Sequence, residues 1–491
     1  MGLPSTRELT VLQPSVELGD PHICDDDRDR GSIMCALYEP LIQHGSGGDY
    51  QPCLATHYRT EDDARTWTFK LRTDVTFHNG HVLEAEDVVA TLERACDPVL
   101  GGKMGTQGVY QSYLEDAAVK AVDSHTVRLV KAWPMSDLLD LLVDIPIVPK
   151  RALDDLPDTP VGSGPYCLAE AEDNNLVMKA FRNYWRGEPP VETVYWRAEP
   201  DPERRIADLL AHEADIVADV SVQNKRTIEA TEHCRVVASQ SSLCIIYMCN
   251  AQSGVCTNKL VRQALNYALD TPKIIDTLKG GAGRPLNGPL TPSHLGYDPS
   301  TSPYGHDPAA ARALLAEAGY ADGLHLILDV PTSLPDEAPK LAQLMAEQYA
   351  SVGITTEIKT FPDRERYADM VRAKRIDDAC CFDSSPLSTY RIFREKVHSG
   401  VRGPWWQGYS NPEVDMLIDQ AQAAVDIAVR RALYRRAHRI IRDDAPWIFL
   451  YSPIYLWGIG PRARGWTAGI DGLINLVSTA ELRKLRDASS C

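Results

Sequence analysis

The sequence lacks the features that bind nucleic acid or cross a membrane. Its 491 residues contain 51 lysines and arginines against 68 aspartates and glutamates, a net charge of −17. Because phosphate backbones and anionic lipid headgroups attract clustered basic side chains, nucleic acid is not an expected partner. The longest apolar stretches, such as residues 138–148, are interrupted by aspartates and are shorter than the roughly 20 residues that span a bilayer. We therefore expect no direct membrane span.

Two further absences concern the compartment. Residues 1–13 contain no basic start, apolar core or cleavage site of a secretory signal. The chain is thus expected to be periplasmic or extracellular and membrane-associated if a signal was trimmed, and cytoplasmic if it is native as given. The twelve cysteines form no CxxC pair and share no recurrent spacing with histidine, which argues against zinc. Mostly buried free thiols are expected, and their number favours a reducing compartment.

Catalytic signatures are also missing: there is no GxSxG, GxxxxGK[ST] or HExxH motif, and no GxGxxG after a strand. His78 and His81 lie close together, but Asn79-Gly80 between them indicates a hairpin turn rather than a metal site. The Gly162-Ser163-Gly164 segment lacks the lysine of a phosphate loop, and a turn joining two lobes is the better interpretation. We therefore predict no catalytic residue, no metal and no cofactor.

What is present indicates a mixed α/β protein. The first 240 residues are strand-rich and also predict a helix at 85–94. The strands are expected at 8–13, 67–71, 123–129 and 176–181. From about residue 258 the pattern becomes helical. Apolar residues recur at helical spacing between Val261 and Leu269, and Asp307-Pro308 and Gly319 mark the start and stop of a second helix.

A regular alternation follows Gly319. Strands are predicted at 324–330, 354–361 and 378–382, with helices at 336–351 and 363–374 between them. Right-handed crossovers build such a series into a parallel sheet with helices on both faces. Because ligands bind outside the carboxyl ends of such strands, the segment Asp383 to Pro386 is a candidate site.

The stretch from Asp383 to Arg394 carries the most polar chemistry. Ser384 or Ser385 is predicted to cap a short helix opened by Pro386. Asp383 is a candidate partner for a ligand ammonium group and Arg391 for a ligand carboxylate, because charge-assisted hydrogen bonds orient small polar ligands. The alternative is a capped surface helix with a local Asp–Arg pair.

Two other places are candidates. Trp405 and Trp406 are adjacent, so that one indole is predicted to pack inward while the other lines a cleft, with core packing of both as the alternative. The run from Asp25 to Arg30 is acidic with interspersed arginines. This pattern favours ion pairs, or an arginine facing a ligand carboxylate, over calcium.

The ordered segments resemble the dipeptide/oligopeptide/nickel class of ABC-transporter solute-binding proteins, the bacterial family 5 extracellular solute-binding proteins. The matching segments are ALYEPL (36–41), residues 67–94, VGSGPY (161–166), NYWRGEP (183–189), LVRQALNYAL (260–269), residues 280–289, YSNPEVDML (409–417) and DDAPWIFL (443–450). The resemblance implies a two-lobe periplasmic-binding-protein-like fold of type II, cluster C, with an extra strand-rich subdomain in the first lobe.

The same resemblance implies the domain boundaries. The first lobe would comprise residues 1–247 and 446–491, with an inserted subdomain at about 35–150. The second lobe would comprise 248–445, with hinges near Asn250 and near Ala445-Pro446. A ligand would bind in the cleft between the lobes, and lobe closure would be biased by that ligand.

Site residues carry over one by one. In peptide-binding members an acidic residue of the second lobe holds the ligand's amino terminus. The position before Pro386 is Ser385 here, so that role would pass to Asp383 or vanish. Ser163, Asn250, and Asp27 with Arg28 in the loop after the first strand are also implied as ligand contacts.

The resemblance implies a non-enzymatic, monomeric component of an ABC importer that delivers a small polar or zwitterionic solute to the permease membrane subunits. The solute would be peptide-like, an amino-acid conjugate or opine-like. The alternative is a scaffold repurposed as a cytosolic small-molecule enzyme or carrier in biosynthesis, motivated by the missing signal and the many thiols. Nickel or other metal uptake has little support from thirteen scattered histidines.

Overall fold

The computed structural model describes residues 8–24, 27–45, 49–61, 64–101, 108–333, 335–469 and 472–476. These residues form two compact units. Unit 1 contains the described residues up to Gln240 and from Tyr455 onward, and unit 2 extends from Ser241 to Ile454. The predicted lobe boundaries and both predicted hinges lie inside unit 2. None of the described helices is long and apolar enough to cross a membrane.

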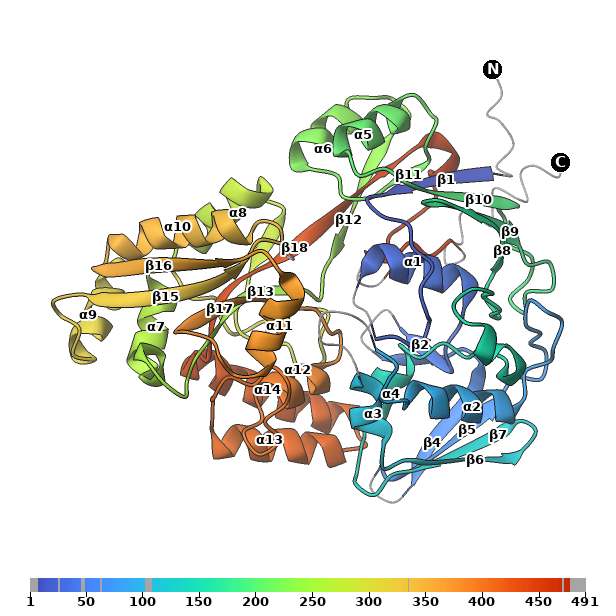
Figure 1. Ribbon diagram of the computed structural model, residues 1–491, viewed down its shortest axis with the longest axis horizontal. Coiled ribbons are helices and arrows are strands. Elements are labelled where there is room, and N and C mark those ends of the chain that lie inside the picture. The colour runs from blue at the N-terminus through green and yellow to red at the C-terminus, as the bar shows by residue number, and fades with distance from the viewer. Residues whose placement is uncertain are drawn as a thin grey trace. The chain divides into compact units, whose positions relative to one another are not determined.

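Unit 1 contains a mixed sheet and a smaller antiparallel sheet (Figure 1). Strand β1 is parallel to β10 and β11, and β9 is antiparallel to both β10 and β8. The strands of this part are β1 (Glu8–Gln13), β8 (Tyr166–Glu172), β9 (Asn175–Ala180), β10 (Thr193–Ala198), β11 (Ile216–Val217) and β12 (Arg235–Gln240). Its core contains Trp196, Tyr166 and Trp466, which are all fully buried.

The smaller sheet lies within residues 55–130, inside the strand-rich insertion predicted at about 35–150. Its strands follow the order β4 (Ala55–Glu61), β5 (Thr66–Leu71), β7 (Thr126–Val130) and β6 (Ala118–Asp123), and β2 (Ile42–His44) pairs with β3 (Tyr50–Pro52). The helices of unit 1 are α1 (Arg28–Leu37), α2 (Ala85–Ala95), α3 (Val109–Leu114), α4 (Leu138–Leu142), α5 (Pro202–Leu210) and α6 (Val222–Glu229), with 3₁₀ turns at Lys150–Asp155 and Pro461–Ala463. The predicted strand at 123–129 is shorter than expected, because Ser124 and His125 form the turn between β6 and β7.

Unit 2 contains the predicted β-α-β-α-β series. Strand β15 (Leu324–Pro331) is parallel to β16 (Ile354–Phe361) and to β17 (Ala379–Ser384). The sheet then continues with two strands that were not predicted from the sequence. Strand β13 (Cys244–Cys249) is antiparallel to both β17 and β18 (Trp447–Ile459). Strand β14 (Gly283–Pro285) also pairs with β18. The sheet is therefore mixed rather than wholly parallel.

Two helices of unit 2 follow their predicted signals. Asp307 caps α9 through its side chain, Pro308 is the first helical residue, and Gly319 follows the helix with a φ of +92°. The apolar stripe from Val261 to Leu269 is buried along α7. The helices are α7 (Lys259–Tyr267), α8 (Thr271–Lys279), α9 (Pro308–Glu317), α10 (Ala338–Ala350), α11 (Arg364–Arg372), α12 (Thr389–Lys396), α13 (Pro412–Ala423) and α14 (Ile427–Asp444), with a 3₁₀ turn at Val255–Thr257.

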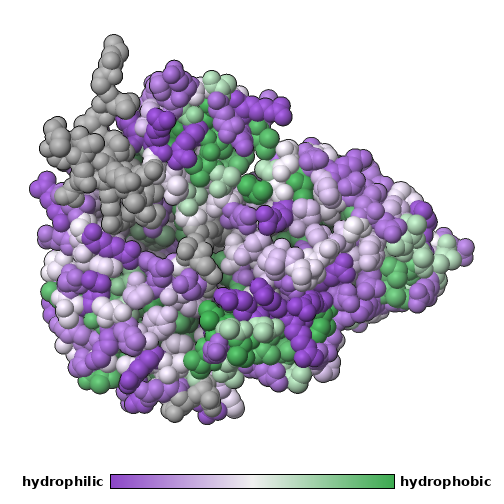
Figure 2. All heavy atoms as spheres, turned by 180° about the vertical axis from the view of Figure 1, so that it is seen from behind, coloured by the Kyte–Doolittle hydropathy of each residue, from purple (hydrophilic) through white to green (hydrophobic). Residues whose placement is uncertain are grey.

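The surface agrees with the acidic, polar composition. Figure 2 shows one face on which hydrophilic side chains are interspersed with smaller hydrophobic patches. Among the described residues the large exposed apolar side chains include Val99, Val122 and Trp133 in unit 1 and Met416, Val425 and Val429 in unit 2. Single exposed apolar side chains of this kind are normal for a soluble domain surface.

Candidate functional site

A buried carboxylate in unit 1 joins three of the sequence motifs. Glu39, from ALYEPL, accepts hydrogen bonds from Ser163 Oγ at 3.0 Å, from Tyr184 Oη at 2.8 Å and from Trp185 Nε1 at 2.8 Å. The Arg186 guanidinium lies 3.8 Å away. Burial raises the pKa of Glu39, and these donors oppose the shift. Ser163 is fully buried, and its hydroxyl serves this network, so its predicted role as a ligand contact stays a prediction.

The two glycines that flank Ser163 are explained by close packing. A Cβ at Gly164 would lie 2.5 Å from the Leu37 carbonyl carbon at the end of α1, and a Cβ at Gly162 would lie still closer to the Leu37 carbonyl oxygen. His78 holds the same loop, because its Nδ1 accepts from Gly162 N and its Nε2 donates to Gly164 O. The loop lies wholly within unit 1, so the prediction that it joins two lobes was wrong.

The start of α1 holds Asp27 and Arg28. The Asp27 carboxylate is exposed and caps the helix by accepting from Asp29 N at 2.8 Å and from Arg30 N at 3.4 Å. The Arg28 guanidinium stacks 3.3 Å from the centre of the Tyr455 ring, in the same unit. Asp25 and Asp26 lie outside the described residues. Asp27 therefore has a helix-capping role, and a ligand contact from either residue stays a prediction.

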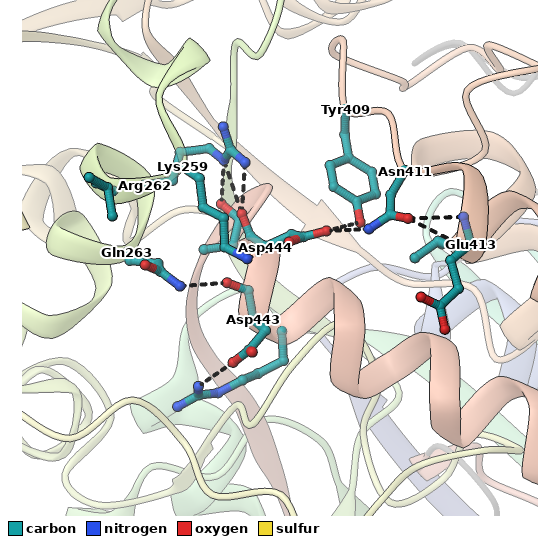
Figure 3. A network of polar contacts seen from close by, with 12 residues as sticks. Lys259, Arg262, Gln263, Tyr409, Asn411, Glu413, Asp443 and Asp444 are labelled. Atoms are coloured by element: carbon teal, nitrogen blue, oxygen red, sulfur yellow. Dashed lines mark hydrogen bonds and ion pairs between the residues drawn. The ribbon is translucent and has the colours of Figure 1, made fainter. Parts of the chain in front are cut away.

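A second carboxylate joins motifs in unit 2 (Figure 3). Asp444, the last residue of α14, accepts hydrogen bonds from Tyr409 Oη and Asn411 Nδ2, both at 2.7 Å. Its carboxylate also forms an ion pair with Lys259 Nζ at 2.7 Å. Arg262 on α7 donates to the backbone oxygen of Asp444 from Nε and Nη2. These donors come from LVRQALNYAL, its flanking residue Lys259, and YSNPEVDML. They fix the end of α14, where Ala445 adopts a φ of +47°.

Asn250 follows β13 in the same unit. Its Nδ2 donates to Ile376 O at 3.0 Å and to Ser253 Oγ at 3.2 Å, and its Oδ1 accepts from the backbone nitrogens of Gln252 and Ser253. An amide has two donor hydrogens and about two acceptor positions. Asn250 thus holds its own loop, and the structure does not test the predicted ligand contact.

The end of β17 places Asp383 and Ser384 on opposite faces of the sheet. Successive side chains of a strand alternate, so Phe382 and Ser384 share one face and Asp383 takes the other. Asp383 Oδ1 lies 3.4 Å from Arg364 Nη2 at the start of α11. The ring of Phe382 lies 5.8 Å from Lys396 Nζ of α12. The acidic candidate therefore faces α11, while Phe382 faces the helix that carries Arg391.

The predicted helix cap was wrong. Ser388, not Ser384 or Ser385, caps α12 by accepting from Arg391 N at 3.1 Å, and the helix begins at Thr389. Ser384 remains in β17, opposite Cys244. Ser385 O accepts from Ser242 Oγ, and Pro386 O accepts from His294 Nε2. These bonds hold the segment before Ser388 as an ordered loop.

A buried charged cluster lies on α12. Arg391, Glu395 and Lys396 are each at most 5 % exposed. Arg391 Nε donates to Glu395 Oε1 at 3.2 Å, and Lys396 Nζ lies 3.9 Å from Glu395 Oε2. Buried charges of this kind are costly unless they are paired, which makes the cluster a place where polar chemistry concentrates.

Trp405 and Trp406 are both buried, at 9 % exposure each. Trp405 lies with its ring 4.9 Å from that of Phe382, and its backbone nitrogen donates to Glu395 O at 3.1 Å. Trp406 donates from Nε1 to Tyr409 O at 2.6 Å. In the described structure neither indole is exposed, so core packing fits both side chains. A part in ligand binding stays a prediction for each.

The structure therefore brings Arg391 and Trp405 together, around Phe382, Glu395 and Lys396, and leaves Asp383 with Arg364. Phe382, Arg364, Glu395 and Lys396 were not among the candidates predicted from the sequence. The four-residue spacing of Arg391 and Glu395 signals a pair on one helix face. Arg364 gave no local signal, because its contact with Asp383 depends on the packing of α11 against the sheet.

Comparisons with known proteins agree with this architecture. Residues 49–413 match the family described as "Bacterial extracellular solute-binding proteins, family 5 Middle". The chain is 28% identical over 451 residues to the glutathione-binding protein GsiB of Escherichia coli (strain K12), with 87% of this chain and 85% of that protein covered.

Solved structures confirm the predicted fold class. HbpA2 from Haemophilus parasuis superimposes with a TM-score of 0.84 at 21% identity, over 96% of this chain and 99% of that one. The binding protein AgaA from A.tumefacien R10, in complex with agropinic acid, gives a TM-score of 0.76 at 22% identity over 95% of each chain. The fold is thus that of the two-lobe periplasmic binding proteins. Together with the match over most of its length, this shows that the chain belongs to family 5 of the bacterial extracellular solute-binding proteins.

Proposed function

We propose that this protein is a non-enzymatic receptor that binds a small polar or zwitterionic solute outside the cytoplasm and delivers it to the membrane subunits of an ABC importer. Family membership is the observation that carries this proposal. By their names, one relative binds glutathione, and one structural neighbour was solved with agropinic acid. Both ligands support a peptide-like, amino-acid-conjugate or opine-like solute.

The polar groups of unit 2 support the same ligand class. Asp383 with Arg364 supplies one carboxylate–guanidinium pair, and Arg391 with Glu395 supplies another, beside Phe382 and Trp405. Paired charges of both signs orient a zwitterion through charge-assisted hydrogen bonds. We propose that the solute's ammonium group is held by Asp383 and a solute carboxylate by Arg391. Four other candidates are weaker because they serve structural contacts: Ser163 donates to Glu39, Asn250 and Asp27 hold neighbouring backbone groups, and Arg28 stacks on Tyr455.

The test is a thermal-shift screen followed by calorimetry. The panel contains glutathione, dipeptides, opines and metal chelates, and the expected result is a one-to-one complex with at least one zwitterionic member. Asp383→Asn and Arg391→Gln are expected to weaken binding about 10- to 100-fold, the usual effect of losing a charge-assisted hydrogen bond. Asp369→Asn and Arg366→Gln change exposed charges on α11 and serve as matched controls.

Two results would contradict the proposal. The first is no stabilisation by any member of the panel. The second is equal affinity in all four variants, which would remove Asp383 and Arg391 from the site while leaving the solute-binding function in place. A melting curve of each ligand-free variant separates lost binding from lost folding, since Arg391 is buried.

A further inference from the structure

One buried histidine holds the backbone of the Pro386 segment, residues 385–391, in unit 2. His294 lies in the connection between β14 and α9 and is 4 % exposed. Its Nε2 donates to Pro386 O at 2.8 Å. The next residue of the same connection is also bound, because Thr389 Oγ1 donates to Leu295 O at 2.7 Å. Two hydrogen bonds therefore join this connection to the Pro386 segment.

The partners of the His294 ring determine its protonation state. Thr291 N donates to Nδ1 at 3.0 Å, so Nδ1 carries no proton. The Pro386 carbonyl oxygen can only accept, so Nε2 carries the proton. The Thr291 hydroxyl lies 2.9 Å from Nδ1 and fits the same arrangement by donating to it. The ring is therefore neutral, with its one N–H directed at Pro386 O.

A positive charge on this ring is unfavourable in the folded unit. Burial lowers the pKa of His294 from 6.5 to about 4. Lys396 of α12 repels a charged ring, and so does His438 of α14, which is itself fully buried, when it is charged. Asp298, in the same connection, pairs with Arg439. The surroundings thus favour the neutral form that binds Pro386.

We propose that His294 is a positioning residue of the solute site, which holds the Pro386 segment in place while its ring is neutral and releases it on protonation. A proton from solvent at Nδ1 places a second N–H opposite the N–H of Thr291, so the ring leaves its position and Pro386 O loses its donor. The segment follows Asp383 and ends at Arg391, the two residues proposed to hold the solute, so this inference rests on the proposed function.

The sign of the pH effect follows from the two pKa values of His294. Above pH 6.5 the ring is neutral whether the segment is held or released, and the contact is complete. As the pH falls from 6.5 toward 4, the released form takes up a proton and the held form does not, so release becomes easier. For these two values the released fraction rises about 20-fold between pH 7 and pH 5.

Hydrogen–deuterium exchange of the ligand-free protein tests the positioning role. The readout is the protection of peptic peptides that cover residues 385–391, corrected for the intrinsic pH dependence of exchange. His294→Asn keeps an acceptor near the position of Nδ1 but is too short to reach Pro386 O. We expect it to speed exchange of the segment about tenfold at pH 7, since a buried carbonyl loses its donor.

The conservative variant separates positioning from simple burial. His294→Gln places an amide N–H near the position of Nε2 and does not titrate. We expect its exchange to stay within about threefold of the wild type at pH 7, because the bond to Pro386 O is restored. The wild type is expected to lose about 20-fold in protection between pH 7 and pH 5, and His294→Gln to lose much less.

His22 of unit 1 provides a matched control. It is 1 % exposed, its Nδ1 accepts from Arg94 Nη1 at 2.9 Å, and its Nε2 donates to another proline carbonyl, Pro146 O, at 2.9 Å. His22→Asn removes the same kind of contact and is expected to leave exchange of residues 385–391 unchanged. Peptides from α9 report whether His294→Asn loosens unit 2 as a whole.

Calorimetry of the same variants tests the consequence for the solute. The probe is glutathione, or the panel member that stabilises the wild type where glutathione does not. We expect His294→Asn to weaken binding about tenfold at pH 7, and His294→Gln to bind within about threefold of the wild type.

Four results would overturn the proposal. They are unchanged protection of residues 385–391 in His294→Asn, an equal acid dependence in the wild type and His294→Gln, an equal loss of protection in α9, and a loosened segment with undiminished solute affinity. Failure of the whole ligand panel contradicts the proposed function instead. The exchange results still decide whether His294 positions the segment, because they are measured without a ligand.

Discussion

In each unit one carboxylate holds segments together that are distant in the sequence, but the two carboxylates differ in burial and in their partners. In unit 1, Glu39 collects donors from two distant segments, around Ser163 and around Tyr184. In unit 2, Asp444 collects donors from α7 and from the segment between Tyr409 and Asn411. Glu39 is 5 % exposed and receives mainly neutral hydroxyl and indole donors, whereas Asp444 is half-buried and pairs directly with Lys259.

The difference shows how burial sets the chemistry of a structural carboxylate. At Glu39 burial raises the pKa by more than the hydrogen-bond donors and Arg186 lower it, so the pKa is raised overall. At Asp444 partial burial also acts to raise the pKa, but Lys259, Asn411 and Tyr409 together lower it. Glu39 therefore contributes by satisfying buried donors, and Asp444 contributes through charge pairing near solvent.

The largest expected effect is that of Glu39→Ala. The substitution leaves the buried Ser163, Tyr184 and Trp185 donors without an acceptor, which costs about 3–5 kcal/mol of unfolding free energy. Denaturant unfolding of unit 1 measures the loss. Glu172→Ala, at an exposed position of β8, is the control and should change stability by less than about 0.5 kcal/mol. If Glu39→Ala also costs less than about 0.5 kcal/mol, Glu39 does not hold the segments around Ser163 and Tyr184 together.

Gly164→Ala tests the same junction by crowding. Its Cβ would lie 2.5 Å from backbone at the end of α1, and backbone cannot move aside as a side chain can. We expect a loss of about 2–3 kcal/mol, in the range of overpacked cores. Gly305→Ala, where a Cβ would meet nothing within 4 Å, is the matched control. Equal stability of the two variants would contradict the close packing of the loop.

Asp444→Asn is expected to cost less, about 1–2 kcal/mol, because the site is half-buried and the amide keeps one acceptor oxygen. The loss should shrink at high salt, which screens the Lys259 pair in the wild type. Asp443→Asn changes the neighbouring carboxylate, which is 68% exposed and pairs with Arg442, and is the control. If Asp444→Asn lowers the free energy of unfolding as much as Glu39→Ala does, the two carboxylates do not differ in their contribution to stability.

The smallest expected effect concerns pH, and its sign differs between the two carboxylates. The raised pKa of Glu39 means that stability falls as pH rises from its unfolded value near 4.5 toward its folded value. The lowered pKa of Asp444 means that stability is lost as pH falls below its unfolded value near 3.8. Glu39→Gln should flatten the first slope and Asp444→Asn the second. Unfolding titrations between pH 3 and 7 measure both, and slopes of the same sign would contradict the assignment.

Much of the fold follows from local signals in the sequence. Asp307-Pro308 caps α9 as predicted, and the alternation after Gly319 predicted β15, α10, β16 and α11 to within a few residues. The antiparallel partners of β17 could not be predicted in this way. Strand β18 is an apolar run near the end of the chain, and its place beside β13 depends on contacts across about 200 residues of sequence.

The candidate site was harder to predict for the same reason. Asp383 and Arg391 are eight residues apart, and this spacing did not reveal that Asp383 faces Arg364 of α11 while Arg391 pairs with Glu395. Ser384 or Ser385 was expected to cap a helix at Pro386, whereas hydrogen bonds from Ser242 and His294 hold that segment as a loop. Both differences come from tertiary contacts that residue spacing does not encode.

The central claim is that this family member binds a small polar solute without changing it. Native mass spectrometry of protein purified gently from its source cells tests this claim most directly, with the solute then released by denaturation and identified. We expect one small polar or zwitterionic solute per chain, recovered chemically unchanged after prolonged incubation with fresh protein. Conversion of the solute into a product, or the absence of any bound solute together with no response to the ligand panel, would contradict it.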